Sequence, residues 1–321
     1  MRSKTRCVQL FSKRDHGGGL DLAIGAHGGS RKDWVDLSTG INPIPYPIPT
    51  LTTDAWTALP DHTAANALCD AARRFWDVPK EADILAAPGA SILIAQIPRL
   101  AKAGSVNIAT PTYNEHAASF AAHEWSIVSS GECSAQVLVH PNNPDGFVWS
   151  STDITAPLAI IDESFCDVSP HSSLINLAAR PGTLVLKSFG KFWGLAGLRL
   201  GFAIGDPSLI AALKEMLGPW PVSGVALEVG TAALNDPSWA AQTRKRLGTD
   251  AARLDAIVCN CGATLVGGTS LFRLYQVDDA TAWQRKLARG RVWSRIFPYA
   301  SDWIRLGLPA PEAWAQVEAA L

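Results

Sequence analysis

The sequence has few cysteines, no block of like charges and no long apolar run. Only one close pair exists among its six cysteines, Cys259 and Cys261, and no second pair completes a zinc site, so we expect reduced, mostly buried thiols and no metal. The uncharged run at residues 84–98 contains a Pro-Gly pair and is too short to span a bilayer. The basic N-terminus lacks a signal-peptide core, which favours the cytoplasm.

The overall composition is that of an ordinary globular protein. The 321 residues are 47% hydrophobic and 18% charged, which is enough for a substantial core in one or two domains. The 28 basic and 29 acidic residues are well mixed, and the formal net charge is −1. No basic stripe points to nucleic acid or to a membrane surface as a partner.

One segment, residues 186–201 (LKSFGKFWGLAGLRLG), concentrates several side chains that could perform chemistry. Lys191 lies among glycines, and an amine that must reach a cofactor carbonyl needs such open backbone and a partly dry site. Ser188 and Arg199 flank it as possible phosphate donors. The alternative is a glycine-rich loop with a solvated lysine.

Strand and helix patterns alternate before this segment, which predicts an α/β fold with a mostly parallel sheet. We expect strands at residues 84–87, 106–109, 135–139, 158–161 and 183–186, and helices at 63–76, 90–103 and 114–124. Pro98 should kink the helix at 90–103 or end it early. The helix start at Ala90 and Ser91 follows a Pro-Gly turn and offers free N–H groups to a phosphate. Asp162 ends a buried strand, where ligands of such sheets bind, and could keep a cofactor ring nitrogen protonated.

A smaller α+β part is expected after residue 205. We expect helices at residues 207–217, 226–234, 238–259 and 310–321, and short strands at 263–266, 271–275, 292–295 and 303–307.

The segment SFGKFWGLAGLRLGFAIG resembles the cofactor-lysine segment of fold-type-I pyridoxal-phosphate (PLP) enzymes, in the branch of the histidinol-phosphate aminotransferases. The resemblance extends over nearly the whole chain, with the motifs in the family's order. It implies a large PLP-binding domain at residues 40–205. It also implies a small domain built from residues 1–39 and 206–321, and a homodimer with the active site near the interface.

The resemblance also implies which residues hold the cofactor. Lys191 would carry the aldehyde, Asp162 would pair with the ring nitrogen, and Tyr113 would stack on the ring. Asn143, in the turn NNPDG, would meet the phenolic oxygen and also face the substrate. The phosphate would be held by Ala90, Ser91, Ser188 and Arg199.

The motifs HGG, DLSTGINP and PYP resemble the N-terminal arm of the threonine-phosphate decarboxylases of aerobic cobalamin biosynthesis. This implies decarboxylation of L-threonine O-3-phosphate. His16 would bind the substrate phosphate, unless it is a plain loop histidine. Arg305, in WIRLG, would grip the α-carboxylate. Arg295 is a second candidate for the phosphate, with a solvated strand end as the alternative.

Two positions depart from the aminotransferase pattern, which has tyrosine at both. Leu59 cannot donate a hydrogen bond, so one phosphate contact across the subunit interface is in doubt. Phe165 cannot reach the phenolic oxygen by hydrogen bonding, which favours the decarboxylase over the aminotransferase. A PLP-dependent aminotransferase and a non-catalytic scaffold of the cobalamin pathway remain as alternatives.

Overall fold

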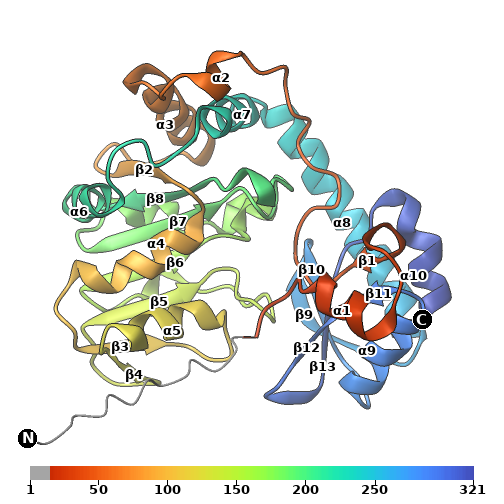
Figure 1. Ribbon diagram of the computed structural model, residues 1–321. Coiled ribbons are helices and arrows are strands. Elements are labelled where there is room, and N and C mark those ends of the chain that lie inside the picture. Colours follow the sequence, from red (N-terminus) through yellow and green to blue (C-terminus); the bar gives the residue numbers. More distant parts are fainter. Residues whose placement is uncertain (1–14) are drawn as a thin grey trace, which may run out of the picture.

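The computed structural model describes residues 15–321 (Figure 1). The first 14 residues of the expected N-terminal arm lie outside the described residues. Seven strands form the large sheet in the order β2-β8-β7-β6-β5-β3-β4. Their bounds are Asp83–Ala87 (β2), Ser105–Ile108 (β3), Ser126–Val128 (β4), Ala135–Val139 (β5), Leu158–Asp162 (β6), Thr183–Ser188 (β7) and Gly201–Gly205 (β8).

The large sheet is mostly parallel, which confirms the predicted fold class. The five strands from β7 to β4 run parallel, whereas β8 is antiparallel to both β7 and β2. Every residue of β6 is buried, as expected for a central strand covered on both faces. We did not predict β4, because its three residues contain only two adjacent apolar side chains. Two of the three residues are exposed, as is common in an edge strand.

Helices cover both faces of the large sheet. Successive side chains of a strand point to opposite faces, and here both faces are apolar and are buried against helices. Ile160 and Leu184 face one core, with α4, α5 and α6, whereas Ile161 and Val185 face the other, with α3 and α7. The bounds are His62–Trp76 (α3), Ala90–Gln96 (α4), Asn114–Ala122 (α5), Pro207–Leu217 (α6) and Gly224–Leu234 (α7). The side chain of Asp61 accepts a hydrogen bond from the amide of Ala64 and so caps α3.

A smaller antiparallel sheet has the order β12-β13-β10-β9, and the long helix α8 runs toward it from α7 (Figure 1). Beside it, β1 pairs with β11, so an early and a late segment of the chain meet there. The division of the chain at residues 40 and 205 stays a prediction. The bounds are Leu20–His27 (α1), Val35–Asp36 (β1), Asp54–Thr57 (α2), Pro237–Asn260 (α8), Thr264–Thr269 (β9), Phe272–Gln276 (β10), Ala280–Arg289 (α9), Val292–Trp293 (β11), Arg295–Phe297 (β12), Ala300–Gly307 (β13) and Trp314–Ala320 (α10).

Pro98 ends the helix expected at 90–103 early, which was one of its two expected effects: α4 ends at Gln96, and a 3-10 turn that contains Pro98 follows. Two other features differ from expectation. The helix α9 was not predicted. Of the five cysteines in residues 15–321, all free, only Cys166 is buried. No helix within this range is both long and apolar enough to cross a membrane.

Candidate active site

Two adjoining cavities lie where β6 and β7 end. We call the one lined by Asp162, Ser188 and Arg199 the inner cavity, and the one lined by His16 and Arg305 the outer cavity. Every predicted site residue lines at least one of them. The residues that line both are Ser91, Tyr113, Asn143, Phe165 and Lys191.

Lys191 lies at the junction of the two cavities, in the loop after β7. Its backbone carbonyl accepts hydrogen bonds from the amides of Asn42 and Gly194, which hold the loop in place. Its amine lies 5.2 Å from the centre of the Phe165 ring. Burial, followed by the positive charge of Arg305, lowers the pKa of Lys191 to about 8. Lys191 is therefore suited to act as a nucleophilic amine near neutral pH.

Asp162 forms one end of the inner cavity and is almost completely buried. Its Oδ2 lies 2.8 Å from Nε2 of His116, and its Oδ1 accepts hydrogen bonds from the amide and hydroxyl of Ser164. Burial alone would raise the pKa of Asp162, but the contacts with His116 and Ser164 outweigh it and hold the pKa below its usual value. The cavity therefore contains a carboxylate that stays ionised.

Donors for an anion gather elsewhere in the inner cavity. Arg199 donates to the hydroxyl of Ser91 at 3.3 Å, and Ser188 lines the same wall. Gly89 allows this approach, because a Cβ at its position would lie 2.5 Å from the Arg199 guanidinium. Gly89 also has a φ of 89°, which favours glycine.

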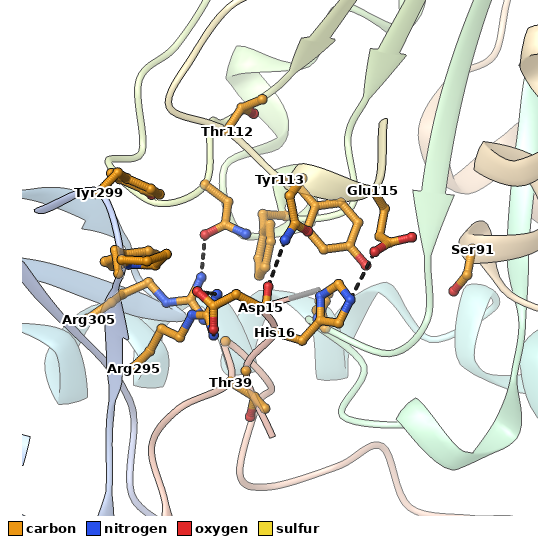
Figure 2. Close-up of a pocket in the computed structure, with 18 residues that line it drawn as sticks. Asp15, His16, Thr39, Ser91, Thr112, Tyr113, Glu115, Arg295, Tyr299 and Arg305 are labelled. Atoms are coloured by element: carbon orange, nitrogen blue, oxygen red, sulfur yellow. Dashed lines mark hydrogen bonds and ion pairs between the residues drawn. The ribbon is translucent and has the colours of Figure 1, made fainter. Parts of the chain in front are cut away.

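Arg305, on β13, is the buried cation of the outer cavity. It donates to the side-chain oxygen of Asn143 (Figure 2) and, at 2.8 Å, to the carbonyl of Ser38. Its Nε has no hydrogen-bond partner among the described residues. Burial, and then the positive charge of Arg295, lower the pKa of Arg305 to about 10. Both of its hydrogen-bond partners are neutral, so Arg305 has no ion pair among residues 15–321.

The other two predicted substrate residues already have acidic partners. Nε2 of His16 lies 2.9 Å from Oε1 of Glu115, and Arg295 binds both carboxylate oxygens of Asp15 at 2.6 and 2.7 Å (Figure 2). Asp15 and Glu115 were not predicted as site residues. Nothing local in the sequence marks them, since each meets its partner only through the tertiary fold.

Beneath the site, a second lysine, Lys187, is completely buried beside two carboxylates. Its amine lies 2.6 Å from Glu163 and 3.4 Å from Asp167, and Asp167 also accepts hydrogen bonds from the indoles of Trp76 and Trp193. Burial alone would lower the pKa of Lys187, but Glu163 and Asp167 raise it above its usual value. Lys187 is therefore held as an ammonium ion and is not a nucleophile.

His140, Glu163 and Cys166 form a cluster of metal-ligand type, with ligand atoms within 4.8 Å of one another. Their ligand atoms already have partners. Nε2 of His140 lies 2.6 Å from the carbonyl of Ser172, and Glu163 pairs with Lys187. The cluster is therefore explained by hydrogen bonds and an ion pair.

The residues of the inner cavity fit pyridoxal phosphate. The cofactor phosphate needs the donors around Ser91, Ser188 and Arg199, the aldehyde needs the amine of Lys191, and the ring nitrogen needs the ionised Asp162. Tyr113 and Phe165 supply the aromatic walls between these groups. Fold and site together define a PLP enzyme with the architecture of the aminotransferases.

Comparison with known proteins identifies the family. Residues 32–320 match the sequence profile of aminotransferase class I and II, and the chain belongs to this family. Threonine-phosphate decarboxylase of Pseudomonas aeruginosa is 36% identical over 96% of this chain and 97% of that protein. Histidinol-phosphate aminotransferase of Desulfitobacterium hafniense is 26% identical over 87% of this chain and 89% of that protein.

A solved structure supports the fold. Histidinol-phosphate aminotransferase from Sinorhizobium meliloti, in complex with pyridoxal 5'-phosphate, superposes with a TM-score of 0.80 at 17% identity. The match covers 99% of this chain and 97% of that one.

The environments of the two lysines predict the point of cofactor attachment. Borohydride reduction of the PLP-loaded protein should fix the cofactor on Lys191, and Lys191→Ala should lose both the adduct and the visible absorption. Peptide mass spectrometry locates the adduct. An adduct on Lys187 would contradict the assignment, because that amine is held as an ammonium ion by two carboxylates.

Proposed function

We propose that the protein decarboxylates L-threonine O-3-phosphate, with pyridoxal phosphate as cofactor. The products are CO2 and (R)-1-aminopropan-2-yl phosphate, and the resemblance places the reaction in cobalamin biosynthesis. The geometric observation that carries the proposal is the buried guanidinium of Arg305, without a counter-ion, in the cavity that Lys191 also lines. The similarity to threonine-phosphate decarboxylase over nearly the full length supports the same substrate.

Arg305 would bind the α-carboxylate of the substrate and set the direction of the bond that breaks. A guanidinium pairs with a carboxylate through two parallel hydrogen bonds. Arg305 can form such a pair, because its Nε has no partner among the described residues and its terminal nitrogens contact only neutral oxygens. Burial makes the pairing stronger than it would be in water.

Lys191 and Asp162 would control the two protons of the reaction, one on Cα and one on the ring nitrogen. When bound, pyridoxal phosphate supplies an electron sink for the pair left on Cα as CO2 departs. The ionised Asp162 would keep a proton on the ring nitrogen. Nζ of Lys191, once replaced by the substrate amine, would return a proton to Cα, for which a pKa near 8 is well matched.

The proposal is tested by incubating the PLP-loaded protein with threonine phosphate. We expect release of CO2 without any keto acid, and aminopropanol phosphate detected by mass spectrometry. An aminotransferase, which would use the same cofactor residues, would instead need a keto acid as amino acceptor. A scaffold would give neither product, but it would have no need of Lys191, Asp162, Asn143 and Arg199 together.

Asp162→Asn should retain PLP but lower decarboxylation at least a hundredfold, on the order of other losses of preorganised charge. The amide can still contact His116 and Ser164, so the fold should be preserved. Steady-state CO2 release measures the loss, and the visible spectrum reports cofactor content. Near-normal turnover would show that the ring nitrogen need not be protonated by Asp162.

His16→Ala should raise the KM for threonine phosphate by about tenfold, the effect of losing one charge-assisted hydrogen bond to the phosphate. His16 lines the outer cavity and its side chain is 41% exposed, so a larger effect is not expected. PLP affinity should not change. Unphosphorylated threonine is the control. An equal loss of kcat/KM with both substrates would mean that His16 orders the N-terminal segment and does not bind the phosphate.

We propose that two copies of the chain form a homodimer. Large apolar side chains are exposed near the start of the chain and before α7: Ile48, Trp56, Leu59 and Trp220, each at least 59% exposed. Because α2, which carries Trp56, packs against α7, these elements offer an apolar surface for a second copy. Sedimentation velocity measures the oligomeric state, and a monomer at micromolar concentration would refute the proposal.

A further inference from the structure

The first described residues of the chain cross the outer cavity and join its two sides. Asp15 binds Arg295 of β12 with its carboxylate, while its backbone carbonyl accepts a hydrogen bond from the side chain of Asn114, at the start of α5, at 2.7 Å (Figure 2). The next residue, His16, reaches Glu115 on the same helix. Asp15 and His16 therefore link the two sides of the cavity through groups that also line it.

The cavity has too little free positive charge for the proposed substrate. Two guanidinium groups line it among the described residues, Arg295 and Arg305. Arg305 contacts only neutral oxygens, so it can balance one carboxylate. Arg295 is 12% exposed and is already neutralised by Asp15 through both of its terminal nitrogens. Once Arg305 binds the carboxylate, a phosphate of about −1.5 to −2 charges therefore finds no unpaired guanidinium among those that line the cavity.

Leaving Asp15 in place would be unfavourable once the substrate arrives. A phosphate that reached Arg295 would lie beside the carboxylate of Asp15, and like charges that close repel each other strongly in a partly buried site. The carboxylate of Asp15, which is 43% exposed, can turn toward solvent at little cost. A phosphate, with its higher charge and three oxygens, makes the stronger fork-like pair with arginine.

We propose that Asp15 is an exchangeable occupant of the substrate phosphate subsite. Its carboxylate holds Arg295 in place and neutralises it in the free enzyme, and the phosphate of the substrate replaces it on the same two nitrogens. Phosphate binding is thereby coupled to release of the arm from β12. The inference rests on the proposed function, because that function supplies the second anion.

The test compares PLP-loaded wild type with Asp15→Asn. Removing the competing charge should lower the KM for threonine phosphate by about threefold to tenfold, a modest effect because the pair is partly solvent-exposed. Isothermal calorimetry should show inorganic phosphate binding tighter by a similar factor. In an Arg295→Gln background, Asp15→Asn should give no such gain, since the shared partner is absent.

Asp33→Asn is the matched control. Asp33 pairs with Arg291 at 2.9 Å in the same part of the fold but does not line the cavity, so KM and phosphate affinity should stay unchanged. An unchanged or raised KM for Asp15→Asn, in a wild type that is active, would overturn the inference. A wild type without activity on threonine phosphate would refute the proposed function instead, and the calorimetry would still decide whether Asp15 competes with phosphate.

Discussion

The buried ion pair between Lys187 and Glu163 is the contact on which the geometry of the site depends. It joins the ends of β6 and β7, and its members are chain neighbours of Ser188 and Asp162. Asp167 extends the network to the indole of Trp193, two residues beyond Lys191. Removing one partner of such a pair leaves a buried, uncompensated charge, which is strongly destabilising. The network therefore fixes three cofactor-binding segments relative to one another.

The same network explains why only one of two nearby lysines is reactive. Lys187 and Lys191 are four residues apart, at the end of β7 and in the loop after it. Carboxylates surround the first and raise its pKa, whereas burial and the charge of Arg305 lower the pKa of the second to about 8. Carboxylates thus keep one amine charged, whereas burial and a neighbouring cation favour the neutral form of the other.

The residues that line the inner cavity could be predicted because each lies at the end of a strand or the start of a helix within a local motif. Asp162, Lys191 and Ala90 follow from the order of elements along the chain, since parallel strands bring their carboxyl ends to one edge. His116 and Asp15 could not be found this way. Each meets its partner only after segments far apart in sequence have packed, and no spacing records that contact. The edge strand β4 was missed for a different reason, because its two apolar residues, Ile127 and Val128, form too short a run to mark a strand.

The sequence HGG occurs twice, at residues 16–18 and 27–29, and the two copies have different roles in the fold. In the second copy, Gly28 ends α1 at a φ of 77°, away from both cavities. In the first, a Cβ on Gly17 would lie 2.3 Å from the carbonyl oxygen of Ser38, the same oxygen that Arg305 binds. Glycine at position 17 therefore lets the chain pack closely on the carbonyl that Arg305 binds. The segment at residues 15–17 thus contacts both guanidinium groups. Asp15 binds Arg295 directly, and Gly17 packs on the Ser38 carbonyl that Arg305 binds. A movement of this segment would therefore change the surroundings of both arginines together.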